Sequence, residues 1–170
     1  MIVVLTRAHA VRAATRLGAL GEVRDVSCGL FGLGRERLAA GHRLALAFVM
    51  QSWGSSPRPA GSVMLVREDM AVEGSVSGGC VEGAVIEAAM TALQDGTGQR
   101  LDFGVADEAA WEVGLSCGGK IAVLVTPVAD QGLSAALLRD MAADIVARRQ
   151  VHVRFDAGTG AIVTETTIPQ

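Results

Sequence analysis

Short apolar runs bounded by glycine, proline and polar residues constrain the fold of this 170-residue chain more than any other feature. Residues 44–50 and 120–126 are each long enough for one buried strand, and a proline stops the second run. Residues 62–67 and 71–75 have the composition of two strands joined by the polar turn Glu68-Asp69, which predicts a hairpin. A second hairpin is predicted around the Gly-Thr-Gly turn at 158–160.

Two segments have the apolar spacing of amphipathic helices, at about residues 80–94 and 133–149. Strands and helices are interspersed, so we expect an α/β class, with α+β as the other possibility. The expected architecture is a mixed sheet with two main helices and glycine-rich loops. We expect residues 1–41 to be a poorly defined N-terminal segment and residues 42–170 to be a single compact domain.

Charge and hydropathy exclude several classes of partner. The net charge is −3, and no run of Lys or Arg supplies the basic surface that nucleic acid requires. No apolar run approaches the roughly 18 residues of a membrane span. The apolar start is too short for a signal-peptide core, so we expect a cytoplasmic protein. Three cysteines without a CxxC pair argue against a disulfide framework and against a structural zinc site.

Glycines concentrate around two of those cysteines, at residues 77–80 and 116–119. Glycine lets the backbone adopt positive φ and come close to a ligand, and consecutive amides in such a turn form an anion-binding concavity. These two loops are therefore the candidate binding loops. The third cysteine, Cys28, is predicted to be a small buried hydrophobe.

The predicted helix start gives Cys80 a special environment. In the first helical turn, unpaired amides and the positive end of the helix dipole favour a thiolate and a neighbouring phosphate. Glu82 opposes this with a negative charge, unless its side chain turns away or pairs with a cation. The alternative is that Cys80 is an unreactive residue packed behind the glycine turn.

Two cations accompany the loops. Arg58 lies between two prolines, which stiffen its loop and make the guanidinium easy to position for a phosphate or carboxylate. Lys120 follows two glycines and adds a second positive charge. The alternatives are an ordinary solvated arginine and a lysine at the end of a strand.

Three segments in order, residues 54–66, 74–85 and 103–121, resemble the XdhC/CoxI family. The resemblance extends over roughly residues 44–128. It implies an accessory protein that binds the molybdenum cofactor, protects it while its terminal sulfur is installed and passes it to a xanthine dehydrogenase or related molybdenum hydroxylase. A cysteine desulfurase is a further implied partner. Many family members continue into a domain resembling a Rossmann fold, so a separate Rossmann-domain protein is another.

The resemblance and the loop chemistry together define the expected cofactor-binding residues. Cys80 is also the candidate contact to molybdenum, and no catalytic residue is assigned. The expected residues are Ser55, Ser56, Arg58, Gly61, Ser77, Gly78, Gly79, Cys80, Glu82, Cys117, Gly118, Gly119 and Lys120.

Two other functions stay open. One is a thiol-dependent sulfurtransferase or oxidoreductase that uses Cys80 or Cys117. The other is a structural subunit that completes a partner carrying the Rossmann part, with the glycine loops as its interface. A homodimer is also expected, because an Ala- and Gly-rich surface leaves apolar patches.

Overall fold

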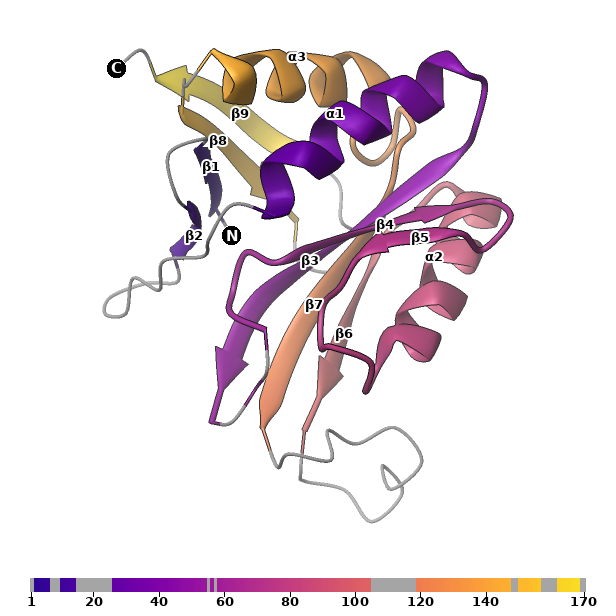
Figure 1. The fold of residues 1–170 in the computed structure, drawn as a ribbon, viewed down its shortest axis with the longest axis vertical. Helices are drawn as coiled ribbons and strands as arrows, with labels where there is room; N and C mark the ends of the chain where they lie inside the picture. The colour runs from indigo at the N-terminus through magenta and orange to yellow at the C-terminus, as the bar shows by residue number, and fades with distance from the viewer. Residues whose placement is uncertain are drawn as a thin grey trace.

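A computed structural model describes the chain over residues 2–6, 10–14, 26–54, 56, 58–104, 119–147, 150–156 and 162–168. Figure 1 shows its strands and helices. The elements in chain order are β1 (Ile2–Thr6), β2 (Ala10–Ala14), α1 (Val26–Ala39), β3 (Leu44–Trp53), β4 (Val63–Arg67), β5 (Val72–Gly74), α2 (Glu82–Asp95), β6 (Gln99–Phe103), β7 (Lys120–Pro127), α3 (Ala135–Val146), β8 (Gln150–Phe155) and β9 (Ile162–Ile168).

The strands form two sheets. The larger sheet has five strands in the order β5-β4-β3-β7-β6, and the smaller sheet has four in the order β2-β1-β8-β9. This mixture of helices and strands confirms the predicted class. All strand pairs in the described parts of the chain are antiparallel, so the sheets follow the α+β arrangement rather than mixing directions. The direction follows from the connections, because each of the hairpins β3–β4 and β4–β5 reverses the chain.

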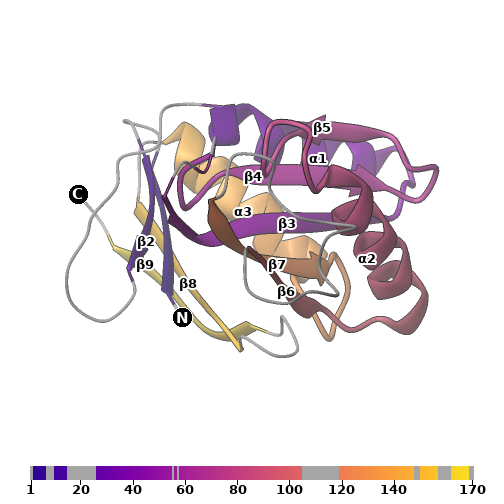
Figure 2. The same cartoon turned by 90° about the horizontal axis from the view of Figure 1, so that it is seen from below.

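Helices cover both faces of the five-stranded sheet (Figures 1 and 2). Helices α1 and α3 pack against each other on one face, and α2 packs on β3 and β7 from the other. Alternate side chains of β3 therefore enter different cores: Leu46 and Phe48 face α1 and α3, whereas Ala45 and Ala47 face α2. Burial on both faces explains why the predicted strand at 44–50 is continuously apolar instead of alternating.

The two cores differ in the size of their side chains. The core beneath α1 and α3 contains large residues, including Phe31 and Phe48, whose ring centroids lie 6.5 Å apart. The core beneath α2 contains mainly alanine and valine, and Ala88, Ala89 and Ala92 of the helix face the sheet. Small side chains on both surfaces bring α2 close to the strands.

The strand registers bring five chain positions to the same end of the large sheet. Strand β3 ends at Trp53 opposite Lys120, the first residue of β7. Strand β4 begins at Val63, and β5 ends at Gly74 beside it; β6 ends at Phe103 opposite Ile121. We call this the loop end of the sheet, because the connections 54–62, 75–81 and 104–119 all leave from it.

The helix ends follow the sequence signals. Gly96, in the left-handed conformation at φ 76°, caps α2 where the Asp-Gly pair predicted an end. The Ser134 hydroxyl accepts a hydrogen bond from the Leu137 amide and caps the start of α3. Helix α1 is a third main helix beside the two expected ones. The Leu-Ala-Ala-Gly run at 38–41 predicts the end of a helix on a glycine, and Gly41, at φ 88°, follows α1 as that pattern indicates.

Elements from the first 41 residues belong to the smaller sheet and to the core of the larger one. Strand β1 pairs with β8, and α1 supplies Leu30 and Phe31 to the large-residue core. No helix in the described segments is both long enough and apolar enough to cross a membrane. The predicted helical turns at 106–113 lie outside the described residues.

Gly74 is the last residue of β5 and lies against the backbone of β4, so replacing it should destabilise the protein. A Cβ atom there would lie 2.4 Å from the Val63 carbonyl oxygen, and φ is +80°. We expect Gly74→Ala to lower the free energy of unfolding by about 2 kcal/mol or more, measured by urea denaturation.

Gly83→Ala is the matched control for that substitution. Gly83 lies in the first turn of α2, and an added Cβ would meet nothing within 4 Å. Alanine there should raise the free energy of unfolding by about 0.5–1 kcal/mol. Equal effects of the two substitutions would contradict the close approach at Gly74.

Candidate functional site

The first and third connections touch each other at the loop end. A Cβ atom at Gly119 would lie 2.7 Å from the Ser56 amide nitrogen and 3.1 Å from the Trp53 carbonyl oxygen. Only glycine therefore permits this approach of the two backbones. The Ser56 hydroxyl in turn donates to the Arg58 carbonyl oxygen at 3.1 Å, which fixes the backbone on which the guanidinium is carried.

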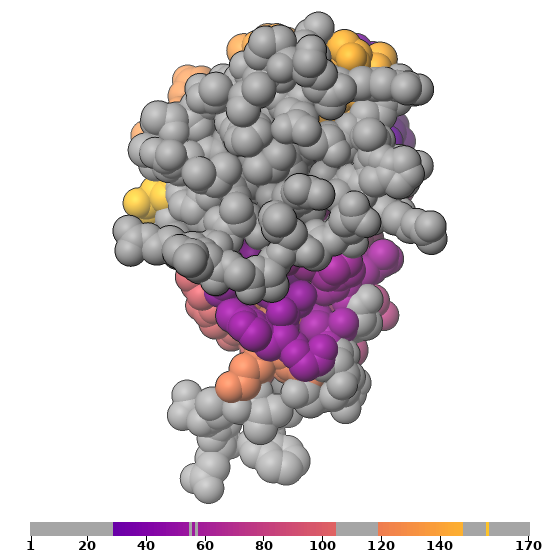
Figure 3. All heavy atoms as spheres, turned by 90° about the vertical axis from the view of Figure 1, so that its left-hand side faces the viewer, coloured from indigo at the N-terminus to yellow at the C-terminus, as the bar shows by residue number. Residues whose placement is uncertain are grey.

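Lys120 extends this contact toward the neighbouring strands. It is exposed, lies opposite Trp53 on β3, and its aliphatic stem passes over Gly104, where a Cβ would lie 2.6 Å from the Lys120 Cγ. Trp53 is itself 49% exposed. Figure 3 shows the end of β3 and the connection that follows it at the molecular surface. An indole, an ammonium group and the Arg58 loop thus adjoin one another at the loop end.

The second connection is organised by a carboxylate. Glu82, the first residue of α2, turns back into the connection and accepts hydrogen bonds from the amides of Ser77 (2.9 Å), Gly78 (3.0 Å) and Gly79 (2.8 Å). The Ser75 hydroxyl donates to it at 2.6 Å, and the Ser77 hydroxyl donates to its other oxygen. The consecutive amides form the predicted anion-binding concavity, and the anion within it is a side chain of the protein itself.

Two glycines make this turn possible. Gly78 and Gly79 have φ values of 79° and 120°, a region that other residues rarely adopt. The turn is attached to the core at both ends, since Val76 and Val81 are buried in the cluster beneath α2. Between them Cys80 is exposed at the surface and is not in a disulfide.

The hydrogen bonds change the acidity of Glu82. Burial by itself raises the pKa of this carboxyl, but the hydroxyls of Ser75 and Ser77 and the Ser77 amide outweigh burial and lower the pKa from 4.5 to about 2. Glu82 is therefore ionised at neutral pH. Its negative charge is matched by oriented donors and not by a cation.

Comparison with known proteins identifies the segment that contains these connections. The model of the XdhC and CoxI family matches residues 37–104. The molybdenum cofactor insertion chaperone PaoD of Escherichia coli (strain K12) is 32% identical over 130 residues, which cover 75% of this chain and 39% of PaoD. The chain belongs to the XdhC and CoxI family.

Two further proteins are similar to this family member. The uncharacterized protein YqeB of Escherichia coli (strain K12) is 38% identical over 82 residues, covering 48% of this chain and 15% of YqeB. A crystal structure described as a xanthine dehydrogenase from Bacillus halodurans superposes with a TM-score of 0.65 at 26% identity, covering 81% of this chain and 41% of that one. The chain therefore spans about two fifths or less of the length of each of these proteins.

The family segment contains two of the three connections at the loop end. It includes Ser56, Arg58 and Gly61 from the first and residues 77–82 from the second. Gly119 and Lys120 follow the matched segment and reach the same place through the β3–β7 pairing. Ser55, Cys117 and Gly118 lie outside the described residues, and the described side chains contain no group of three or more His, Cys, Asp or Glu that could hold a metal ion.

The structure corrects the expected environment of Cys80. Helix α2 begins at Glu82 with Val81 as its N-cap residue, so Cys80 precedes the helix and is not in its first turn. The prediction failed because Val81 and Val85 gave a helical apolar spacing that continued back through the turn. The amides beside Cys80 also have a partner, since those of residues 77–79 donate to Glu82. Glu82 neither turns away nor pairs with a cation; it fills the turn.

Two residues at the site were not anticipated from the sequence. Ser75 donates to the Glu82 carboxylate from seven positions upstream, a separation that no helix-capping motif specifies, so the sequence alone could not indicate it. Trp53 gave no sequence signal beyond its position, because its exposure depends on where β3 outruns the helices that cover the sheet. Both lie beside residues that were expected to bind the cofactor.

The lowered pKa of Glu82 predicts an acid-dependent contribution to stability. Its pKa is about 2 in the folded protein and about 4.5 in the unfolded chain, so the stabilisation is complete above pH 4.5 and is lost as pH falls toward 2. The difference in free energy of unfolding between the wild type and Glu82→Gln, from urea denaturation, should therefore shrink over that range. An exposed carboxylate on the same helix, replaced in Glu87→Gln, should give little difference at any pH. A Glu82 difference that is constant from pH 6 to 2.5 would contradict the assignment.

Proposed function

We propose that this chain is a cytoplasmic accessory protein that holds the molybdenum cofactor during its sulfuration and delivers it to a xanthine dehydrogenase or related molybdenum hydroxylase. One observation carries the proposal: segments that resemble the family and are far apart in sequence leave the same end of the sheet. These segments carry an exposed thiol, Cys80, and two cationic side chains, Arg58 and Lys120.

The cofactor is a cargo that carries a phosphate, a planar pterin and a sulfur-bound metal, and the loop end offers groups for each. Arg58 and Lys120 are cations suited to the phosphate. The exposed indole of Trp53, beside Lys120, offers a flat surface for the pterin. The Cys80 thiol is the group suited to the metal or to its sulfur.

The amides of the glycine turn are not assigned to the phosphate in this proposal. Three of them already donate to the Glu82 carboxylate, and an approaching phosphate would meet that negative charge. In this proposal, the side chains of Arg58 and Lys120 therefore bind the phosphate of the cofactor. Gly78 and Gly79 serve to present Cys80 rather than to bind the cargo.

The names of the similar proteins support the same assignment. PaoD is named a molybdenum cofactor insertion chaperone, and the Bacillus halodurans structure is described as a xanthine dehydrogenase. Because the chain spans only 39% of PaoD, a partner that supplies the remaining part is compatible with the proposal. A separate Rossmann-domain protein and a cysteine desulfurase are the partners to seek first.

Binding of anaerobically prepared molybdenum cofactor to the purified chain tests the proposal. We expect near-stoichiometric binding, weakened about 10- to 100-fold in Arg58→Ala, because a charge-assisted hydrogen bond contributes about 1.5–3 kcal/mol. Arg139→Ala removes an exposed arginine from α3, away from the loop end, and should leave the affinity unchanged. Affinity should be measured by fluorescence titration at two salt concentrations.

Two results would count against this assignment. Absence of binding by the folded protein would favour the structural-subunit function, in which a partner completes the site. Equal losses in Arg58→Ala and Arg139→Ala would mean that general charge, and not the loop end, attracts the cofactor.

A thiol-dependent sulfurtransferase is the second candidate, favoured by the exposure of Cys80. Such an enzyme would take one sulfur atom from a persulfide donor as a persulfide on Cys80 and pass it to an acceptor, returning the thiol. Mass spectrometry after incubation with the donor would show a Cys80 peptide heavier by one sulfur atom, and repeated turnover with an acceptor. Failure of Cys80 to accept sulfur would remove this candidate.

A further inference from the structure

Glu82 is the point at which the hydrogen bonds of the Cys80 turn converge. Its two carboxylate oxygens accept from the amides of Ser77, Gly78 and Gly79 and from the hydroxyls of Ser75 and Ser77. Hydrogen bonds to an ionised acceptor are about twice as strong as neutral ones.

The hydrogen bonds enclose Cys80 from both sides along the chain. The residue before it, Gly79, donates its amide to Glu82 at 2.8 Å. The residue after it, Val81, donates its amide to the Ser77 hydroxyl at 3.0 Å, and that hydroxyl itself donates to Glu82. The peptide unit between Gly78 and Gly79 is therefore tied directly to this carboxylate, and the unit between Cys80 and Val81 is tied to it through one hydroxyl.

Packing alone does not hold the middle of this turn. Val76 and Val81 are buried in the core at its two ends, but Gly78, Gly79 and Cys80 are exposed and are not among the residues of that core cluster. Glycines at positive φ also lose more conformational entropy on ordering than other residues. Internal hydrogen bonds must supply the order, and Glu82 accepts most of them.

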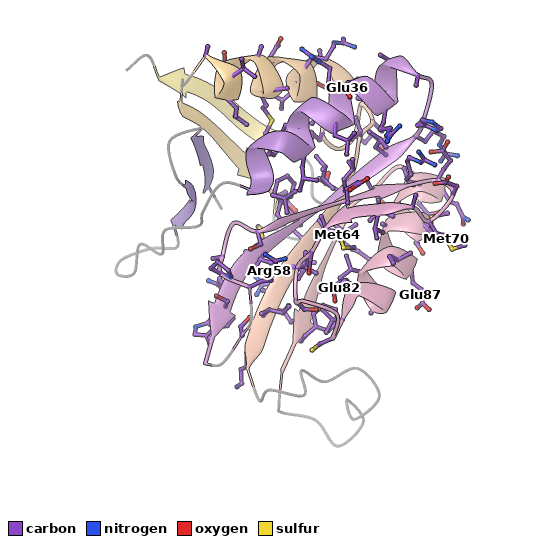
Figure 4. All side chains as sticks on the ribbon, viewed as in Figure 1. Glu36, Arg58, Met64, Met70, Glu82 and Glu87 are labelled. Carbon is purple, nitrogen blue, oxygen red and sulfur yellow. The ribbon has the colours of Figure 1, made fainter. Side chains whose placement is uncertain are left out.

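We propose that Glu82 is a positioning residue that fixes the Cys80 thiol at the loop end of the sheet, by acting as the permanent anion of the glycine turn. It does not contact the cargo and acts through Cys80. The part of this inference that concerns cofactor affinity rests on the proposed function. Figure 4 shows Glu82 at the start of α2 beside the sheet, whereas Glu87 projects outward from the same helix.

Glutamine at position 82 separates the charge from the shape. Its side chain has nearly the same size, but one oxygen becomes an NH₂ donor that faces the donors on that side of the turn. The Gly79 amide and the Ser77 hydroxyl would then lose their acceptor. The substitution does not change Val76 or Val81, so the packing of α2 on the sheet should be retained in this variant.

The test combines amide hydrogen exchange with a double-mutant cycle. Glu82→Gln should speed exchange of the 76–81 amides about tenfold or more, while exchange in β3 and β7 stays as in the wild type. It should weaken cofactor binding about tenfold, and this loss should vanish when Cys80 is already alanine, because the two residues act as one unit. Glu87→Gln is the matched control and should change neither quantity.

Ser75→Ala provides a second route to the same network. It removes one donor to Glu82, at 2.6 Å, without changing the charge of the turn. It should speed hydrogen exchange of the 76–81 amides less than Glu82→Gln does. It should also weaken cofactor binding by a correspondingly smaller factor. This milder variant decides the question if Glu82→Gln proves too unstable to study.

Several results would overturn the inference. Unchanged exchange at 76–81 in Glu82→Gln would show that the carboxylate does not hold the turn. A loosened turn with unchanged affinity, or a loss of affinity that persists in the Cys80→Ala background, would show that Glu82 does not act through Cys80.

Failure of the proposed function gives a different pattern. If the wild-type chain binds no cofactor, the cargo assignment falls, while faster exchange confined to 76–81 in Glu82→Gln still establishes Glu82 as the anchor of Cys80. In that case the rate of Cys80 alkylation by iodoacetamide, followed by peptide mass spectrometry, replaces affinity as the readout. An alkylation rate that does not change despite the loosened turn would then overturn the inference.

Discussion

The antiparallel pairing of β3 with β7 is the constraint on which the rest of the structure depends. Both strands are buried on both faces, so helices must cover the sheet on each side. Side chains of the two strands contribute to both hydrophobic cores, which lie on opposite faces of the sheet. Because the pairing ends at Trp53 and Lys120, it also determines where the backbone becomes exposed. The close approach at Gly119 is a direct result, since the strand ends carry their connections into contact.

The carboxylate of Glu82 provides hydrogen-bond acceptors for the backbone amides of the glycine turn at the same end of the sheet. A turn with consecutive inward-facing amides attracts an anion, and an empty one would leave several donors without partners. Here the chain provides its own anion from the start of α2. In the proposed function, the turn is thereby ordered before the cargo arrives, and the cationic side chains of Arg58 and Lys120 are left to attract it. Preorganisation of this kind lowers the entropy lost on binding.

Most elements of the large sheet were predictable because their signals are local. The strand at 44–50, the hairpin at 62–75 and the C-terminal end of α2 follow from apolar runs, turn residues and a glycine cap. The beginning and length of α1 were not predicted, because glycines interrupt its apolar pattern and only its glycine end gives a local signal. Strand β1 was missed because it pairs with the distant β8, and β2 because it pairs with β1. The start of α2 was placed too early, since apolar spacing does not distinguish a helical turn from a glycine turn that leads into it. Membership of the XdhC and CoxI family rested on three ordered segments, and the comparison with known proteins confirmed it.

The sequence by itself determined which residues are the candidates for the proposed chemistry: two glycine-rich loops, Cys80, Arg58 and Lys120 are identified by residue type and local order. Only the tertiary structure decided how they meet and what the glycine turn binds. The gathering at the loop end depends on strand register, which is set by contacts between segments more than fifty residues apart. The role of Glu82 depends on the direction of one side chain, which returns into the turn because six donors converge there and no local spacing rule specifies that geometry.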